Sequence, residues 1–244
     1  MKKLIYFTLG NNENYSKLAS LCVNSLYKND YDGDFLFITN FKEKILDSII
    51  FKKDPFFLDI ENADLLNSSA NKLKVYQFRN INDYDKIIYS DLDVLWLSNP
   101  DIIFNEIIED KFYVSNEDEL MSHEYWGGNI LNENEKLIIK NNNIKGINAG
   151  LFGFNKKMIN HLKKIEEFLT QNKHLVNVCL EQPFVNVYLF RNDLYSNVLN
   201  KNVSNNGNNV ESYNGVVLHF AGGIGNPEHK YNKIINYINK NGNI

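Results

Sequence analysis

Cysteine, arginine and long apolar runs are all scarce in this 244-residue chain. Its two cysteines, Cys22 and Cys179, lie in apolar surroundings and form no CxxC pair, which predicts buried free thiols in a reducing compartment and argues against a disulfide framework. Arg79 and Arg191 are the only arginines, and the net charge is −4. Because no block of basic residues is present, the chain is predicted to bind no nucleic acid.

Apolar stretches are plentiful but short. None approaches the roughly 20 apolar residues of a membrane-spanning helix. The basic N-terminus leads into an apolar run that breaks off at Gly10, which is too short for a signal-peptide core and is typical of a first buried strand. We therefore expect a cytoplasmic protein without a membrane span, whose 43% hydrophobic content is enough for a sizeable core.

Short apolar runs alternate with amphipathic segments along the chain. Residues 4–10 and 34–40 read as strands with a helix at 14–29 between them, which predicts a β-α-β unit. Further strands are expected at 86–97, at 111–116, within 147–158, which passes from a glycine-containing turn to a strand, and at 215–223. Further helices are expected at 41–49, 68–81, 98–108, 161–172, 181–190 and 231–240, and polar loops at 117–147 and 196–214. This order predicts one α/β domain with a mostly parallel sheet flanked by helices.

Two carboxylates interrupt the apolar segment 86–97. An ionised carboxylate taken out of water costs several kcal/mol unless it is paired or bound to a metal. If the strand continues through Asp91 and Asp93, both point to the same side, and if it ends there, both lie at the carboxyl edge where open α/β sheets bind ligands. A divalent cation that joins them to a phosphorylated ligand would relieve their repulsion. The alternative for a lone DxD motif is a pair of turn-capping residues.

A third candidate ligand is His219, which ends an apolar strand beside a glycine turn where backbone amides can approach phosphate oxygens. A lone histidine on an apolar run is more often a hydrogen-bonded core residue. As a ligand, its imidazole would shift the expected ion from Mg²⁺ toward Mn²⁺. Lys230 and His229 follow shortly after, and either can offer positive charge to a diphosphate or be a solvated residue at a helix start. For His229 the solvated helix start is the preferred interpretation.

Several separated segments carry a family resemblance. In chain order they are FTLGNNENYSKLAS, the stretch from NKLKVYQ to DLDVLWLSNPDIIF, INAGLFGFN, LEQPFVNVYL and VLHFAGG. In these segments the chain resembles the retaining GT-A glycosyltransferases of family eight, and among them the glycogenin-like members most closely. The resemblance implies a Rossmann-like GT-A fold in a single domain over residues 1–244, with a nucleotide-binding half at 1–100 and a half for donor sugar and acceptor at 101–244.

The resemblance also implies a site. Around the nucleotide it places Thr8, Leu9, Asn11, Asn12, Tyr15, Lys72, Asp91, Leu92 and Gly222; on a Mn²⁺ or Mg²⁺ ion it places Asp91, Asp93 and His219; and at the donor sugar and the reaction it places Asn148, Glu181, Gln182 and Lys230. Two departures stand out. Glu181 stands where the family usually has aspartate. After HFAGG the chain reads IGNPEHK, where the family has Lys-Pro-Trp a few residues on, so Lys230 is the candidate to replace that lysine.

The activity implied is transfer of a hexose from a nucleotide diphosphate sugar, first of all a UDP-sugar, to a hydroxyl of a glycan or protein acceptor. Retention of configuration is implied, with front-face attack and the leaving phosphate taking the acceptor proton. A second copy of the chain, in a homodimer, is a further candidate partner. Acceptor choice is expected to reside in residues 117–147 and 196–214, because loops on a rigid scaffold carry specificity.

Two alternatives remain at this point. A phosphatase of the haloacid dehalogenase type also places DxDx[TV] at a strand end, and DLDV satisfies that pattern with Asp91 as the nucleophile. Those enzymes place the motif near the start of the chain and need a later Gly-Asp acidic pair. The other alternative is a non-catalytic sugar-binding or protein-binding module with the same fold.

Overall fold

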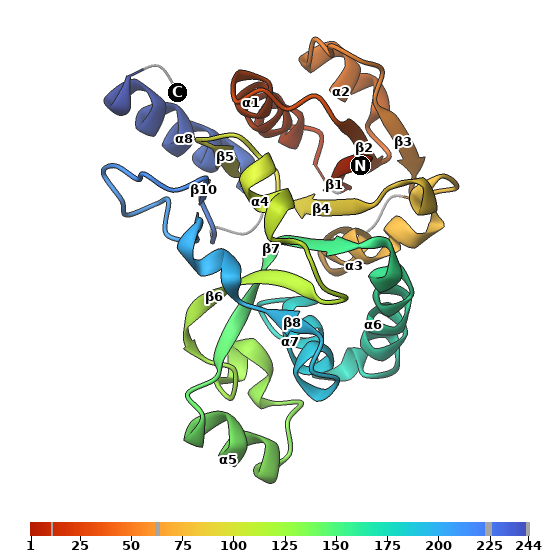
Figure 1. Cartoon of the computed structure of the whole chain (residues 1–244), viewed down its shortest axis with the longest axis vertical. Coiled ribbons are helices and arrows are strands. Elements are labelled where there is room, and N and C mark those ends of the chain that lie inside the picture. Colours follow the sequence, from red (N-terminus) through yellow and green to blue (C-terminus); the bar gives the residue numbers. More distant parts are fainter. Residues whose placement is uncertain (11, 62–63, 223–225, 243–244) are drawn as a thin grey trace.

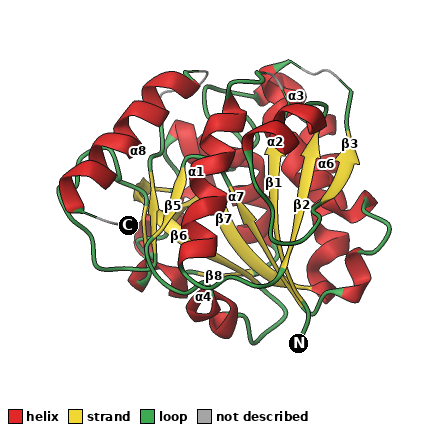
Figure 2. Cartoon of the chain, turned by 90° about the horizontal axis from the view of Figure 1, so that it is seen from above, coloured by secondary structure: helices red, strands yellow, loops and turns green. Residues whose placement is uncertain are grey.

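A seven-stranded sheet forms the centre of the chain, and helices cover both of its faces (Figures 1 and 2). The computed structural model describes residues 1–10, 12–61, 64–222 and 226–242. The sheet has the order β3-β2-β1-β4-β7-β6-β8, and its strands are β1 (Lys3–Leu9), β2 (Asp34–Thr39), β3 (Phe56–Asp59), β4 (Lys86–Ser90), β6 (Phe112–Leu120), β7 (Lys145–Asn155) and β8 (Tyr195–Ser196). Strands β3, β2, β1 and β4 are parallel, whereas β7 is antiparallel to β4 and β6. The predicted mostly parallel sheet is confirmed.

A second, three-stranded sheet joins distant parts of the sequence. Its strands are β5 (Val94–Trp96), β9 (Val203–Ser204) and β10 (Val217–His219), in the order β5-β10-β9. Strand β5 pairs antiparallel with β10, and this register puts Val94 opposite His219. Because β5 follows the end of β4 after only three residues, the pairing brings His219 beside Asp91 and Asp93.

Two apolar clusters fill the space between the sheet and its helices. The helices are α1 (Tyr15–Lys28), α2 (Lys42–Ser48), α3 (Leu65–Ala70), α4 (Asp101–Glu106), α5 (Glu133–Asn141), α6 (Ile159–Gln171), α7 (Gln182–Arg191) and α8 (Pro227–Asn241). One cluster lies under α1, α4 and α8, where α1 contributes Leu18, Cys22 and Leu26 at helical spacing. The other lies under α6 and α7 on the opposite face. Among the described residues, no helix combines the length and apolar character that a bilayer crossing needs.

The sequence predicted one strand at 86–97, but the structure divides this segment between β4 and β5. Strand β4 ends at Ser90, where the N–H of Asp91 donates to the carbonyl of Gly150 at 2.7 Å. The chain then leaves the large sheet through Asp91–Asp93 and enters the small sheet as β5. The two carboxylates therefore lie in a turn at the carboxyl end of β4, which is the second of the two arrangements that the sequence left open.

Three other expectations are corrected. The helix predicted at 68–81 begins at Leu65, is capped by Asp64, whose side chain accepts the N–H of Asn67 at 2.8 Å, and continues from Asn71 to Gln77 as a 3₁₀ helix. The segment 117–147 contains helix α5, which starts in a capping box and buries only one residue, so its apolar periodicity is weak. The turn predicted before residue 150 is absent, because β7 runs unbroken from Lys145 to Asn155.

Candidate active site

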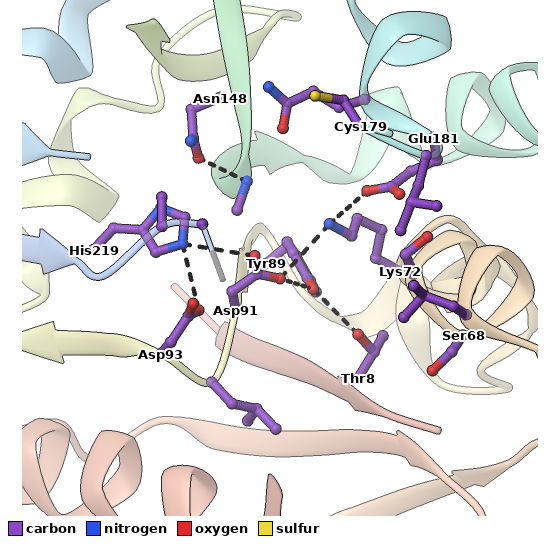
Figure 3. Close-up of a pocket in the computed structure, with 18 of the residues that line it drawn as sticks. Thr8, Ser68, Lys72, Tyr89, Asp91, Asp93, Asn148, Cys179, Glu181 and His219 are labelled. Carbon is purple, nitrogen blue, oxygen red and sulfur yellow. Dashed lines mark hydrogen bonds and ion pairs between the residues drawn. The ribbon is translucent and has the colours of Figure 1, made fainter. Parts of the chain in front are cut away.

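Side chains from separate segments line one cleft of about 410 Å³ at the carboxyl ends of β1 and β4 (Figure 3). Thr8 comes from β1, Asp91 from the turn after β4, and His219 from the end of β10. Parallel strands present their carboxyl ends at the same edge, which is the edge where open α/β sheets bind ligands. The position of the DxD motif therefore agrees with a binding function rather than with a simple turn cap.

Asp91, Asp93 and His219 form the centre of the cleft. The Nε2 atom of His219 lies 3.3 Å from Oδ1 of Asp93 and 3.7 Å from Oδ2 of Asp91. One ligand atom from each residue lies within 4.8 Å of the others. Asp93 and His219 are 4% and 3% exposed, whereas the side chain of Asp91 is 31% exposed. The cluster is therefore a buried acidic site that is open on the Asp91 side.

Lys230 from the first turn of α8 also contacts Asp93, through Nζ and Oδ2. Burial would raise the pKa of Asp93, but the charges of His219 and Lys230 beside it lower that pKa well below its usual range. Burial would likewise lower the pKa of His219, but Asp93 and then Asp91 raise it. The carboxylate is thus held ionised, in the form that binds cations.

Lys72 lies at the second charged centre of the cleft. Its Nζ is 2.7 Å from Oε1 of Glu181 and 3.6 Å from Oδ1 of Asp91, and it donates to the carbonyl of Ala149 at 3.1 Å. Burial would lower the pKa of Lys72, but Asp91 and Glu181 outweigh that effect and raise it. Leu180, directly before Glu181, has a φ of 55°, an unusual conformation for a residue other than glycine. A strained turn therefore precedes the buried Lys72–Glu181 ion pair.

A cluster of amides occupies the part of the cleft next to Lys72. Oε1 of Glu117 accepts hydrogen bonds from Nδ2 of Asn148 at 2.8 Å and from Nε2 of Gln182 at 3.2 Å. The amide oxygen of Asn148 accepts the N–H of Gly150 at 2.8 Å. Glu117 thus fixes the orientation of both amides, and with it the donors and acceptors that they present to a ligand.

Comparison with known proteins adds to this geometry. Neither a protein-family model nor a curated protein sequence matches the chain. Solved structures do match its fold. The galactosyltransferase LgtC in complex with donor and acceptor sugar analogues gives a TM-score of 0.65 at 16% identity, over 96% of this chain and 95% of LgtC, and an active-site mutant of LgtC gives the same values. The bifunctional glycosyltransferase WbbM gives 0.61 at 14% identity, over 98% of this chain and 49% of WbbM.

The chain has the GT-A fold. The fold expected from the sequence resemblance is therefore confirmed. At 14–16% identity the likeness concerns the fold alone, so membership of the glycogenin-like group and the roles of individual residues remain predictions.

Almost all residues that the sequence analysis assigned to the site lie along this one cleft of the GT-A fold. They are Thr8, Leu9, Tyr15, Lys72, Asp91, Leu92, Asp93, Asn148, Glu181, Gln182, His219, Gly222 and Lys230. Asn11 lies outside the described residues. Asn12 is not among the residues that line the cleft; its Oδ1 accepts the N–H of Asn14 at 2.9 Å and its carbonyl accepts the N–H of Tyr15 at 3.2 Å, so it shapes the start of α1.

Other lining residues escaped the sequence analysis, among them Ser68, Tyr89, Glu117, Trp126 and Cys179. Tyr89 donates to Oδ1 of Asp91 and lies 3.1 Å from the hydroxyl of Thr8. Its place two residues before Asp91 was the available signal, since alternate residues of the strand predicted at 86–97 share a face. Cys179 was predicted to be buried, but it is only half-buried at the cleft wall. Glu117 and Trp126 lie in the segment that was predicted as loop.

The residues of the cluster fit a divalent cation. Two carboxylates and one imidazole are a donor set for Mn²⁺ or a similar ion. The backbone of β7 leaves space for them, because a Cβ added to Gly150 would lie 2.2 Å from Cε1 of His219 and 2.8 Å from Oδ2 of Asp91. Nδ1 of His219 is buried and has no hydrogen-bond partner in the described part of the chain. The ring is thus held by packing and by the acids at Nε2.

Replacing Gly150 by alanine is expected to weaken Mn²⁺ binding about 10- to 100-fold, because Asp91 and His219 must move away from the new methyl group. Titration calorimetry with Mn²⁺ measures this. Gly153→Ala on the same strand is the matched control: its Cβ would lie 2.7 Å from Cδ1 of Ile107, the end of a flexible side chain in the core. Equal Mn²⁺ affinity in the two variants would contradict the close approach of β7 to the cluster.

Proposed function

We propose that the chain is a metal-dependent, retaining glycosyltransferase that moves a hexose from a nucleotide diphosphate sugar, first of all a UDP-sugar, to a hydroxyl acceptor. The observation that carries the proposal is the meeting of Asp91, Asp93 and His219 with a buried lysine and two amides in one cleft. The GT-A fold, shared with LgtC and WbbM, supports the same class of reaction.

The cation site would be formed by Asp91, Asp93 and His219, with Mn²⁺ favoured over Mg²⁺ by the imidazole. A bound divalent cation supplies Lewis-acid stabilisation of the diphosphate that leaves. Tyr89 positions Asp91 through its hydrogen bond to Oδ1. Lys230, which contacts Asp93, would place a further positive charge beside the diphosphate.

Positive charge from the protein would act where negative charge develops. Lys72 is 5% exposed and its pKa is raised, by Asp91 and Glu181 against the opposing effect of burial, so it carries a fixed charge at a buried position in the cleft. Charges and dipoles that are already oriented in such a site stabilise a developing anion more strongly than mobile water does. Lys72 and Lys230 are therefore assigned to the leaving group.

The amides and Glu181 would orient the donor sugar rather than attack it. Glu181 is 4% exposed and its Oε1 is paired with Lys72 at 2.7 Å, which makes it a poor nucleophile. Asn148 and Gln182 are held by Glu117 and offer neutral hydrogen-bonding groups. This arrangement favours front-face attack by the acceptor hydroxyl, with the leaving phosphate taking its proton.

The phosphatase alternative is not favoured. It needs Asp91 as a free nucleophile, whereas Oδ1 of Asp91 accepts a hydrogen bond from Tyr89 and lies 3.6 Å from Lys72. The third group at the aspartates is the imidazole of His219, where that class needs a later acidic pair.

A screen of UDP-, GDP- and dTDP-sugars with and without Mn²⁺ tests the proposal. A UDP-sugar with Mn²⁺ is expected to raise Tm by about 5–10 °C at 100 times its Kd and to be hydrolysed slowly. Neither the UDP-sugar alone nor Mn²⁺ alone should raise Tm by that amount. Release of phosphate from small phosphomonoesters, with no response to any nucleotide sugar, would instead establish the phosphatase. Stabilisation by a UDP-sugar without any turnover would indicate a binding module.

A further inference from the structure

Tyr89 divides the two carboxylate oxygens of Asp91 between the protein and the cation site (Figure 3). The hydroxyl of Tyr89 donates a hydrogen bond to Oδ1 of Asp91. The other oxygen, Oδ2, lies 3.7 Å from Nε2 of His219, and a Cβ on Gly150 would lie 2.8 Å from it. One oxygen of Asp91 is therefore held by a protein donor, and the other one faces the cluster that fits a cation.

The hydrogen bonds of the Tyr89 hydroxyl have a fixed direction. A carboxylate oxygen can only accept, so the phenol gives its proton to Asp91. The hydroxyl oxygen of Thr8 lies 3.1 Å from the phenol oxygen, and Thr8 is then the donor between these two hydroxyls. The protein thus uses both the proton and a lone pair of the phenol, which keeps the Tyr89 hydroxyl on Asp91.

The ring of Tyr89 is packed between two neighbouring strands. Tyr89 is 1% exposed and pairs in the large sheet with Tyr6 of β1 and Phe152 of β7, whose ring centroids each lie 5.1 Å from its own. Nζ of Lys72 lies 4.7 Å from the centroid of the Tyr89 ring and 3.6 Å from Oδ1 of Asp91. Turning Oδ1 toward the cation site would therefore break the bond to Tyr89 and move the negative charge away from Lys72.

The second aspartate is restrained differently. Oδ1 of Asp93 lies 3.3 Å from Nε2 of His219, and its Oδ2 contacts Nζ of Lys230. Lysine carries its charge on a long flexible stem, so Lys230 on the first turn of α8 can move when the carboxylate turns. Of the two acidic groups, Asp91 is therefore the one whose number of available ligand oxygens is fixed.

Divalent cations differ in what they need from a carboxylate. Ca²⁺ takes about six to eight oxygen ligands and often uses both oxygens of one carboxylate. An octahedral ion such as Mn²⁺ needs about six ligands, and one oxygen from each carboxylate is enough for it. Because Tyr89 holds Oδ1 of Asp91, the cluster withholds an oxygen that Ca²⁺ would use and keeps those that Mn²⁺ needs.

We propose that Tyr89 is a positioning residue that selects Mn²⁺ over Ca²⁺, because it restricts Asp91 to coordination through Oδ2 alone. Loss of the hydroxyl would free Oδ1 for the ion, which favours the cation that takes both oxygens. The inference rests on the cation site of the proposed function, but not on the identity of the sugar or the acceptor.

Tyr89→Phe tests the inference, because it removes the hydroxyl and keeps the ring beside Nζ of Lys72. Free Mn²⁺ is measured by electron paramagnetic resonance, and Ca²⁺ is titrated as the competitor, with and without UDP. We expect the Kd for Mn²⁺ to rise about tenfold, since partners of metal ligands commonly contribute that much, whereas the Kd for Ca²⁺ stays the same or falls. The ratio of the two constants should therefore shift at least about tenfold in favour of Ca²⁺.

Tyr84→Phe is the matched control. Tyr84 is fully buried and donates to Oδ2 of Asp34 at 2.8 Å, so this variant loses the same kind of hydrogen bond at a place that does not line the cleft. Both of its Kd values should equal those of the parent chain.

The inference is overturned if Tyr89→Phe raises both Kd values by the same factor or changes neither, or if the parent chain binds no Mn²⁺ in either condition. A parent chain that binds Mn²⁺ but no nucleotide sugar would overturn the proposed function alone. The ratio of the two constants would still decide the role of Tyr89.

Discussion

Replacing Asp93 by asparagine is expected to lower kcat/KM for Mn²⁺-dependent transfer by about 10³-fold while the chain stays folded. The amide keeps the shape of the side chain but removes the charge that faces His219 at 3.3 Å and Lys230. Turnover of a UDP-sugar with Mn²⁺ measures the loss, and the Tm shift on adding a UDP-sugar together with Mn²⁺ should disappear with it. Circular dichroism checks that the fold is retained.

Asp34→Asn is the control for this experiment. Asp34 is 5% exposed, pairs with Lys53 and accepts the hydroxyl of Tyr84 at 2.8 Å, but it lies at the start of β2, at the edge of the sheet opposite the cleft. This variant should lose stability and keep its response to Mn²⁺. Undiminished turnover in Asp93→Asn would end the metal assignment, and equal losses of turnover in both variants would mean that stability alone had changed.

The contribution of Asp34 to the stability of the fold depends on pH. Burial would raise the pKa of Asp34, but Lys53 and Tyr84 lower it overall. The carboxylate therefore contributes stability above its unfolded pKa of about 4, and this contribution is lost as the pH falls through the lower folded pKa. Asp34→Asn lacks that contribution, so its stability should fall less steeply on acidification.

Local patterns in the sequence were enough for most of the fold. Apolar runs and helical spacing predicted β1, α1 and β2, and the charged pair within the apolar segment 86–97 indicated a binding site. The strand break at Ser90 was not predicted, because it depends on the pairing of β5 with β10, more than a hundred residues away. Such a pairing leaves no local pattern in either segment.

The candidate site was predictable to the extent that single residues carry distinctive chemistry. Asp91, Asp93 and His219 stand out as polar groups in apolar runs. Glu117 does not, because its contact with Asn148 depends on the irregular register between β6 and β7. Trp126 was hidden in an Asn-rich segment whose ordering depends on buried contacts with Asn186 and Gly146.

The departure at Glu181 has a structural consequence. The sequence raised the question of what an extra methylene does where the family usually has aspartate. The longer side chain reaches Nζ of Lys72 at 2.7 Å, and both side chains are almost fully buried. A buried ion pair is far more sensitive to the loss of one partner than a surface pair, because the remaining charge has no water around it.

Replacing Lys72 by methionine is therefore expected to lower the free energy of unfolding by about 3 kcal/mol at neutral pH, measured by urea denaturation. Glu181→Gln should lower it less, because Lys72 keeps Asp91 at 3.6 Å and the carbonyl of Ala149 at 3.1 Å. In the double variant neither charge of the pair remains, so its loss should be smaller than the sum of the two single losses. Additive losses would show that the two side chains are not coupled.

The surface pair Lys136–Glu133 separates the effect of burial from that of contact distance. Its N–O distance of 2.8 Å nearly equals the 2.7 Å of Lys72–Glu181, but its side chains are 34% and 88% exposed. Lys136→Met should therefore change the stability far less than Lys72→Met does.

Binding of UDP with Mn²⁺ separates the two roles of Lys72. It should be weakened both in Lys72→Met and in the double variant, which also carries Glu181→Gln. The second substitution should restore stability without restoring that binding. Recovery of both together would mean that Lys72 serves the fold and not the donor.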